Sequence, residues 1–315
     1  MLELLTRLGL PANLSAQGGT IDDALVWTHI LMVILFLFWA PFFIYTLIRF
    51  RKSKNPNASY KGIRSHFSNY MEGGVAVFEV VLLLGFAFPA WELRVNEVPP
   101  AADAEIVRVV AQQFKWNVHY PGPDGEFGRT DVSLINDEVL NFIGLDYESE
   151  TAKDDILPPQ GHLHLPVDKP AIIQLSTRDV IHSFSIPVMR VKQDVIPGMR
   201  IPVWFEPTQT GSWEIACAQL CGNSHYEMKG YIHIHTQKGY DAFMDALSIV
   251  NEIDDYDLTF EADKKLNKVI KFLRAGDAET AESFAVEAKS LAKIALQEKE
   301  EMGEEDEWED WDEWE

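Results

Sequence analysis

The sequence predicts a membrane-anchored all-β protein, with two N-terminal transmembrane helices, a Greek-key β-sandwich, a helical hairpin and an acidic tail. Long apolar stretches lie within the first 92 residues, short β-branched runs follow from residue 105, and amphipathic helical spacing begins after residue 240. We expect an N-terminal extracytoplasmic segment, a transmembrane hairpin, a β domain, a helical extension and the tail. Their ranges are 1–25, 26–92, 93–240, 241–299 and 300–315.

The two apolar stretches are long enough to cross a bilayer. Residues 26–48 contain no Asp, Glu, Lys or Arg, and as a helix they would rise roughly 35 Å, against a hydrocarbon core of ~30 Å. Residues 73–91 are shorter and include one carboxylate, Glu79. Pro89 and Trp91 are typical of a helix end and an interfacial anchor.

The loop at residues 49–72 predicts the orientation of the hairpin. It holds six Lys and Arg residues and no acid before Glu72. Short basic loops stay in the cytoplasm. We therefore expect a multi-pass protein of a bacterial inner membrane, with both termini and the β domain on the periplasmic side.

Five runs in the β domain have the composition of strands, namely EIVRVVAQQFKWNVHY, AIIQLSTRDVIHSFSI, RIPVWFEP, GSWEIAC and GYIHIHT. Gly, Pro, Asn and Asp mark turns between them, for example in KQDVIPG. This pattern favours an antiparallel Greek-key sandwich or barrel. Residues 120–168 are expected to form an acidic insertion, either a solvated loop or a docking face for a basic protein.

After the β domain, residues 238–250 predict a terminal helix, and residues 257–277 and 278–300 predict a helical hairpin. Gly276 and Asp277 suit the stop of one helix and the N-cap of the next. The tail carries eleven Asp and Glu residues without Lys or Arg, so we expect it to be disordered. The net charge of −22 makes nucleic acid an unsuitable partner.

The strongest chemical signal is a cluster of metal donors. The chain has two cysteines, in the pattern Cys217-x3-Cys221-x3-His225-x2-Met228, and His182 lies upstream. Thiolate, imidazole and thioether together favour redox copper or structural zinc. Two thiolates four residues apart can bridge two metal ions, which favours a binuclear copper centre. A zinc site would leave Met228 unused, and a disulfide would leave the histidines unused.

The segments DVIHSF, VKQDVIPGMR and CAQLCGNSHYEM resemble subunit II of cytochrome c oxidases, over roughly residues 25–240. The resemblance implies a cupredoxin domain with two copper ions, in the centre called CuA. Its ligands would be His182, Cys217, Cys221, His225, Met228 and the backbone carbonyl of Gln219.

The same resemblance implies the role of the chain and its partners. The copper centre would accept electrons from a c-type cytochrome and pass them to haem in subunit I, where oxygen is reduced to water with proton pumping. Subunit I, subunit III and the lipid bilayer would be its partners, and haem would lie in the partner subunit only.

Three positions are notable against the family pattern. Position 219 is commonly Glu, whose carboxylate helps to hold magnesium at the boundary with subunit I, so Gln219 puts that ion in doubt. Phe114 stands where the family commonly has the tryptophan that receives the electron. Phe114 and Trp116 are therefore the two candidates for this role, although Trp116 is more typical of a core residue. Glu79 resembles a glutamate at the mouth of a proton channel, or it is an acid that reaches the headgroups.

Other functions remain open on the sequence. The chain also fits subunit II of a copper-containing nitric oxide reductase, or a stand-alone membrane-tethered cupredoxin that carries electrons. A quinol oxidase subunit is disfavoured because such relatives typically lack the copper ligands. The tail, with Trp308, Trp311 and Trp314, is either solubilising or a docking peptide for a basic cytochrome or another respiratory complex.

Overall fold

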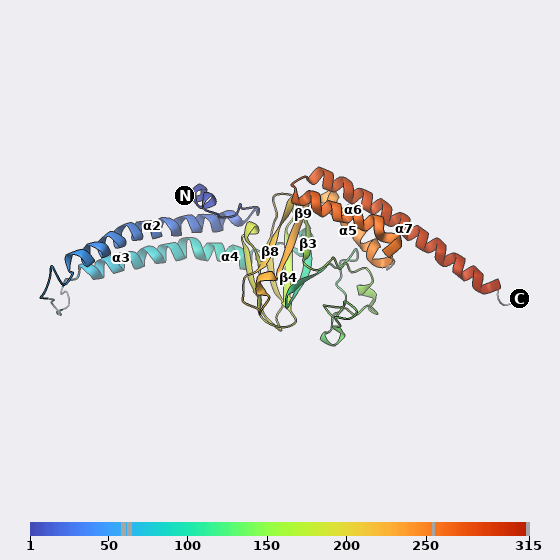
Figure 1. The fold of residues 1–315 in the computed structure, drawn as a ribbon, viewed down its shortest axis with the longest axis horizontal. Coiled ribbons are helices and arrows are strands. Elements are labelled where there is room, and N and C mark those ends of the chain that lie inside the picture. The colour runs from blue at the N-terminus through green and yellow to red at the C-terminus, as the bar shows by residue number, and fades with distance from the viewer. Residues whose placement is uncertain (58–60, 62–64, 254–255, 313–315) are drawn as a thin grey trace. The chain divides into compact units, whose positions relative to one another are not determined.

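The computed structural model describes residues 1–57, 61, 65–253 and 256–312 (Figure 1). The chain forms two compact units, each described below by itself. The first comprises Met1–Ala12 and Gln17–Val98, and the second comprises Asn13–Ala16 and Pro99–Glu315.

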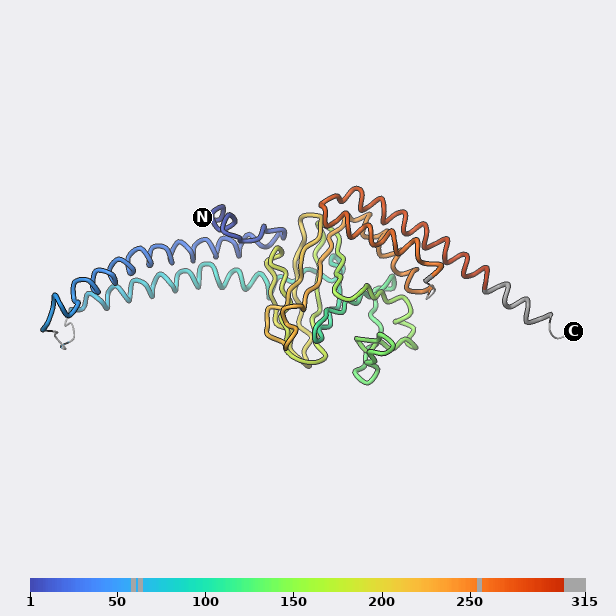
Figure 2. Tube along the Cα trace, in the orientation of Figure 1, coloured from blue at the N-terminus to red at the C-terminus, as the bar shows by residue number. Residues whose placement is uncertain are grey.

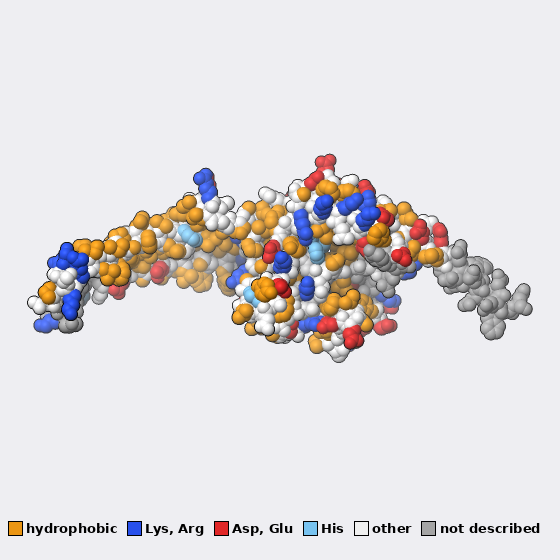
Figure 3. Space-filling view, viewed as in Figure 1, with side chains coloured by type: hydrophobic (Ala, Val, Ile, Leu, Met, Phe, Trp, Pro, Cys, Tyr) orange, Lys and Arg blue, Asp and Glu red, His pale blue; other side chains and the backbone are white. Residues whose placement is uncertain are grey.

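The first unit consists of helices. A short helix α1 (Leu2–Arg7) precedes α2 (Gly18–Arg49), and a second long helix covers residues 67–96. Both long helices are long and apolar enough to cross a membrane, and their apolar side chains are exposed rather than packed into a core. Lys and Arg side chains gather at the loop between them, whereas hydrophobic side chains cover the helices (Figure 3).

The second long helix has three parts, α3 (Phe67–Leu82), the π-helical segment η1 (Leu83–Ala87) and α4 (Phe88–Asn96). It extends past the end that was predicted near Pro89 and Trp91. Pro89 has no N–H group to donate to the carbonyl four residues earlier. That carbonyl belongs to Gly85 in the π-helical segment. The wider π-helical turn accommodates the missing hydrogen bond, so the helix continues to Asn96 instead of ending.

The second unit is built on two sheets that share one hydrophobic core. The four-stranded sheet has the order β2-β1-β4-β7, and the five-stranded sheet has the order β3-β9-β8-β5-β6. The first sheet contains β1 (Glu105–Gln112), β2 (Lys115–His119), β4 (Ala171–Thr177) and β7 (Ile201–Phe205). The second contains β3 (His162–Pro166), β5 (His182–Ile186), β6 (Val191–Val195), β8 (Gly211–Cys217) and β9 (Lys229–His235).

The prediction of antiparallel sheets is wrong for two pairs. β1 pairs in parallel with β4, and β3 pairs in parallel with β9. Turn signals can reveal hairpins between strands that follow each other in the sequence, but they say nothing about distant partners. A parallel pair needs a long crossover, and its partners are chosen by tertiary packing rather than by a local signal.

Two strands were missed in the sequence. β6 covers VKQDV, where the sequence predicts a turn, and β3 lies at the end of the predicted insertion. In β3, His162 and His164 alternate with Leu163 and Leu165, but His164 is as fully buried as the leucines. Histidine at buried positions conceals the strand pattern, because it is normally counted as polar.

The insertion at residues 120–161 is irregular, and its trace runs beside the sheets (Figure 2). It has a small core of Ile143, Leu145 and Ala152. The buried carboxylate of Asp155 lies 2.6 Å from Nε2 of His119 on β2 and fastens the insertion to the sheet. These contacts make it more than a solvated loop. The structure does not test the alternative of a docking face.

Three helices complete the unit, α5 (Gln237–Ile253), α6 (Tyr256–Arg274) and α7 (Ala278–Asp312). The predicted stop and cap are confirmed, since Gly276 has φ +78° and Oδ1 of Asp277 accepts a hydrogen bond from N–H of Thr280. The α7 backbone continues past 299 into the predicted tail, because extending an existing helix costs less than nucleating one. Side chains beyond residue 302 lie outside the described part.

Candidate metal centre

Neighbouring strands and one loop bring the predicted donors together. His182 is the first residue of β5, and Cys217 is the last residue of β8. β5 and β8 are hydrogen-bonded neighbours, with Phe184 opposite Cys217. The chain then turns through residues 218–228 before β9 begins, and this turn carries the other four predicted donors, Gln219, Cys221, His225 and Met228.

The donor atoms converge around the two sulfurs. The Sγ atoms of Cys217 and Cys221 lie 3.8 Å apart, and both cysteines are free thiols. Around Cys217 Sγ, Nδ1 of His182 lies at 3.9 Å and the carbonyl oxygen of Gln219 at 3.2 Å. Around Cys221 Sγ, Nδ1 of His225 lies at 3.5 Å and Sδ of Met228 at 3.7 Å. Each sulfur therefore has one imidazole and one weaker donor beside it.

The two thiols differ in their acidity. Burial raises the pKa of Cys217, but hydrogen bonds involving His182 and the backbones of Ser183 and Gln219 outweigh burial and bring this pKa to about 6. Burial and the neighbouring charge of Cys217 raise the pKa of Cys221 to about 12. Cys217 is therefore the more acidic of the two thiols. A metal ion that binds both sulfurs must displace the proton of Cys221.

Asp179 orients His182 and was not singled out in the sequence. Its Oδ1 lies 2.8 Å from Nε2 of His182, which leaves Nδ1 of the ring toward Cys217. The carboxylate also accepts hydrogen bonds from the backbone N–H groups of Gln113 and Val180, at 2.6 and 2.7 Å. Ligating histidines commonly hold a carboxylate at their second nitrogen. An acid three residues before a candidate histidine is the signal that could have found it.

The loop that joins β1 to β2 contacts the donor loop at Cys221 and Gly222. Nε2 of Gln113 donates a hydrogen bond of 2.6 Å to the carbonyl of Cys221. Phe114 is half-buried, and a Cβ on Gly222 would lie 3.0 Å from its ring. Trp116 is fully buried and packs edge-on against His182 and Phe184, with ring centroids at 6.2 and 5.4 Å. Of the two predicted aromatic residues, Phe114 is the one with exposed surface next to the centre.

The donor set suits soft metal ions. It combines two cysteine sulfurs, two imidazoles, a thioether and a carbonyl, and both cysteines and Met228 are buried. Thiolates 3.8 Å apart leave space for metal ions at ~2.3 Å from each sulfur. Soft sulfur ligands with imidazole select copper or zinc, and a thioether as an additional weak ligand is typical of copper electron-transfer sites. The residues present therefore fit copper.

The other predicted position, Glu79, lies in the first unit. It is exposed on α3 and lines a groove between α2 and α3 together with Leu35 and Trp39. The helix begins at Phe67, so Glu79 is well separated from the end of the helix. The carboxylate is thus available to a neighbouring chain on this helical surface.

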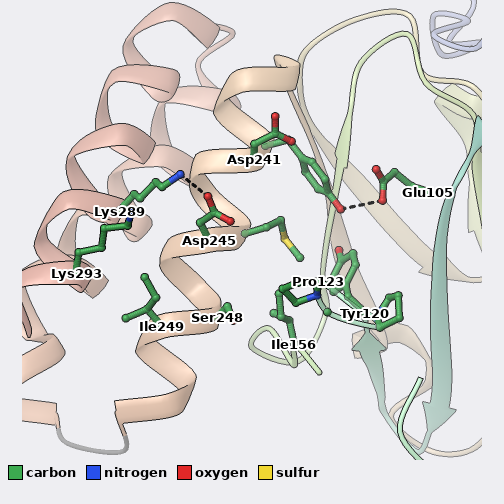
Figure 4. A pocket seen from close by; sticks show the side chains of 14 residues that line it. Glu105, Tyr120, Pro123, Ile156, Asp241, Asp245, Ser248, Ile249, Lys289 and Lys293 are labelled. Carbon is green, nitrogen blue, oxygen red and sulfur yellow. Dashed lines mark hydrogen bonds and ion pairs between the residues drawn. The ribbon is translucent and has the colours of Figure 1, made fainter. Parts of the chain in front are cut away.

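The second unit also has a cleft of about 570 Å³ between α5, α7 and the sheet edge (Figure 4). Lys289 pairs there with Asp245, and the Tyr240 hydroxyl donates a hydrogen bond of 3.4 Å to Glu105. The lining contains no cysteine or histidine. Apart from the thioether of Met244, this cleft offers none of the soft donors that are gathered around Cys217 and Cys221.

Comparisons with known proteins point to one family. The family profile of the cytochrome c oxidase subunit II periplasmic domain matches residues 106–235. The chain is 32% identical to the alternative cytochrome c oxidase subunit 2 of Bradyrhizobium diazoefficiens, over 74% of this chain and 82% of that relative. It is 28% identical to cytochrome c oxidase subunit 2 of Synechocystis, over 75% of each chain.

A solved structure is also similar to part of this chain. It is the periplasmic domain of subunit II of cytochrome oxidase from Bradyrhizobium japonicum, at 25% identity and a TM-score of 0.34, covering 48% of this chain and 96% of that chain.

The β domain, its cysteine–histidine cluster and the two apolar helices define a subunit of the haem-copper oxidase class. Within this class the chain belongs to the cytochrome c oxidase subunit II family. The resemblance seen in the sequence is thereby confirmed. Enzymatic activity in this family belongs to the oxidase complex, of which this chain is one part.

Proposed function

We propose that the chain is the electron-accepting subunit of a respiratory haem-copper oxygen reductase. The observation that carries the proposal is the convergence of donors around Cys217 and Cys221, with one imidazole and one weaker donor beside each sulfur. Two copper ions bound there would supply a one-electron carrier whose charge is shared across both thiolates. The donor would be a c-type cytochrome, and the acceptor would be haem in subunit I, which reduces oxygen with proton pumping.

The residues of the chain itself prepare the site for this role. Cys217, Cys221, His182, His225 and Met228 would hold the copper ions with the carbonyl of Gln219. Asp179 fixes the ring of His182 from behind, and this lowers the freedom of the ligand to move when charge changes. Buried donors on a β framework keep the ligand geometry rigid, which favours fast electron transfer.

The surface beside the centre supports electron transfer to and from partners. Leu220 and Tyr226, both in the donor loop, are 78% and 79% exposed. An exposed apolar rim is suited to close contact with another protein. We infer that electrons arrive through this rim and that Phe114 is the aromatic contact closest to the centre, with Trp116 as part of the core beneath it.

Membrane topology belongs to the same proposal. The helices α2 and α3–α4 would span the bacterial inner membrane, with the basic loop in the cytoplasm and the cupredoxin-like Greek-key domain in the periplasm. Subunits I and III would surround them, and Glu79 would lie at the mouth of a proton channel. The amide of Gln219 is a poor ligand for a hard cation, so a magnesium ion at the subunit I boundary would need other ligands.

Copper loading of the full-length chain in detergent tests the central claim. We expect two copper ions per chain and the EPR and absorption signals of a mixed-valence pair. Cys217→Ser should abolish those signals, whereas the exposed His66→Ala should retain them. A stoichiometry of one zinc ion, or two copper ions without a mixed-valence signal, would contradict the proposal.

Co-purification separates the oxidase from the two alternatives. An oxygen reductase subunit should co-purify with a haem-bearing partner that reduces oxygen when a reduced c-type cytochrome is supplied. Isolation of the chain alone from native membranes would favour a tethered electron carrier. A haem partner that reduces nitric oxide but not oxygen would favour the reductase.

A further inference from the structure

Four histidines of the second unit lie on one face of two neighbouring strands. His162 and His164 alternate along β3, and His233 and His235 alternate along β9. The two strands are parallel, with His164 opposite His233. Alternate residues of a strand point to the same face. The intervening residues, Leu163, Leu165, Ile232 and Ile234, belong to the hydrophobic core on the other face.

The four rings are close enough to share ligands. Nδ1 of His162 lies 2.9 Å from Nε2 of His233, and Nδ1 of His164 lies 2.9 Å from Nε2 of His235. One nitrogen from each of His162, His164 and His233 falls within 4.8 Å of the others. This cluster uses none of the predicted copper ligands.

Two buried nitrogens in the cluster lack a hydrogen-bond partner among the described residues. They are Nε2 of His164 and Nδ1 of His233, whose side chains are fully buried. Ser212 lies directly opposite His233 in the β8–β9 ladder, and its buried hydroxyl also lacks a partner within the described chain. Buried polar atoms normally have a partner, so each such atom calls for an explanation.

The surroundings keep the histidines in the form that binds metal. Phe243 of α5 stacks on His164 with ring centroids 4.2 Å apart and covers the cluster. Burial lowers the pKa of His164 and His233 well below the usual value, and it lowers the pKa of His235 to about 3. Neutral imidazole is the ligating form. His162 is only partly buried, which leaves a route from solvent.

We propose that His162, His164 and His233 form a second metal site, for a divalent transition-metal ion bound by nitrogen alone. Zinc is the appropriate probe, because three histidines with an open fourth position form a recurrent zinc site. Two nitrogens bound to one tetrahedral zinc ion lie about 3.3 Å apart. The distance between Nδ1 of His162 and Nε2 of His233 would increase by a few tenths of an ångström, and the ring of His164 would move toward the ion.

Metal binding would also resolve the unpartnered atoms. When Nε2 of His233 binds the ion, the ring proton of His233 resides on Nδ1. This is the nitrogen that has no hydrogen-bond partner in the described part of the chain. The hydroxyl of Ser212, opposite His233 in the β8–β9 ladder, is the candidate acceptor for this N–H group. His235 would hold the second nitrogen of His164, as outer partners of ligating histidines do. The ion would join β9 to β3, an edge strand that follows the long insertion.

Zinc binding by the full-length Cys217→Ser/Cys221→Ser chain tests the site, because this background removes both thiolates. The protein should be purified without a polyhistidine tag. We expect one zinc ion per chain after gel filtration and a melting temperature that rises with zinc concentration. His162→Gln and His233→Gln should each lower the zinc association constant more than about tenfold. His66→Gln, at an exposed position, should leave it unchanged.

The His162→Gln variant should still fold, because this half-buried side chain can be replaced without opening the core. A loss of zinc binding in this variant therefore reports on the site itself. A further variant concerns Arg274, whose guanidinium lies over the Tyr231 ring at 4.4 Å. Burial is the main cause that lowers the pKa of His162 and His233, and the charge of Arg274 adds to it. Arg274→Met should strengthen zinc binding, since it removes a nearby cation. Absence of stoichiometric zinc, or zinc that persists in both His162→Gln and His233→Gln, would overturn the proposal.

Discussion

The two donor clusters of the second unit are built in different ways. Around Cys217 and Cys221, most donors come from one short loop, mix sulfur with nitrogen and have an exposed rim at Leu220 and Tyr226. The histidine cluster comes from regular strands, offers nitrogen only and is covered by α5. A loop can place chemically different donors beside a partner surface. A strand face repeats one donor type under a helix.

The largest expected effect comes from removing the cover over the histidines. Phe243 is 2% exposed, and Phe243→Ala should lower the free energy of unfolding by about 3–5 kcal/mol, because it leaves a cavity above His164. Denaturant unfolding followed by tryptophan fluorescence measures this loss. The copper spectrum of the folded protein should stay unchanged.

The matched control is Phe260→Ala in α6, at a side chain that is 43% exposed, which should shift stability by less than about 0.5 kcal/mol. If Phe243→Ala instead changed the copper spectrum while leaving stability intact, the two clusters would not be separate structures.

The next effect concerns the copper loop. Asp179→Asn should weaken copper binding about 10- to 100-fold, because the amide no longer holds His182 with a charged oxygen. Competition with a copper chelator measures the affinity. Asp194→Asn, at an exposed position of β6, should bind copper as the unmodified chain does. Equal affinities for the two variants would show that Asp179 does not position the ligand.

A smaller effect on the melting temperature is expected at the N-terminus of α7. Asp277 caps α7, and Asp277→Ala should lower the melting temperature by about 2–4 °C, whereas Asp277→Ser should retain most of the cap. Calorimetry of the full-length chain at neutral pH distinguishes the two variants. An equal loss in both would point to the helix dipole rather than to the cap.

The same cap has a defined pH dependence. Hydrogen bonds from the hydroxyl and N–H of Thr280 lower the pKa of Asp277 below its usual 3.8. Because the folded pKa is lowered, the stabilisation is present above the unfolded pKa and is lost as pH falls through the folded pKa. The difference in melting temperature between Asp277→Ala and the unmodified chain should therefore be constant from pH 7 to pH 5 and become smaller below about pH 4. A difference that vanished already at pH 6 would contradict this assignment.

The smallest expected effect is at Gln219. Its carbonyl, rather than its side chain, lies beside Cys217, so Gln219→Glu should leave copper stoichiometry and affinity unchanged within about twofold. Copper titration checks this expectation. A loss of affinity above tenfold would mean that the side chain, and not the backbone, governs the site.

Much of the copper loop could be predicted from the sequence, because Cys217, Cys221, His225 and Met228 are close along the chain. The contacts of Gln113 with Asp179 and with Cys221 could not be assigned, since they depend on the pairing of β4 with β1 and on the loop after β1. The histidine cluster was missed for the same reason. Its halves are about 70 residues apart and meet only through the parallel pairing of β3 with β9.

The sequence by itself determined the two apolar helices, the cap at Asp277 and the donor loop, because each depends on residues within a few turns or one short loop. The tertiary structure decided the parallel pairs, the packed insertion and the meeting of the histidines. Those features arise when strands distant in sequence bury a common face, and no local pattern specifies which strand will be the partner.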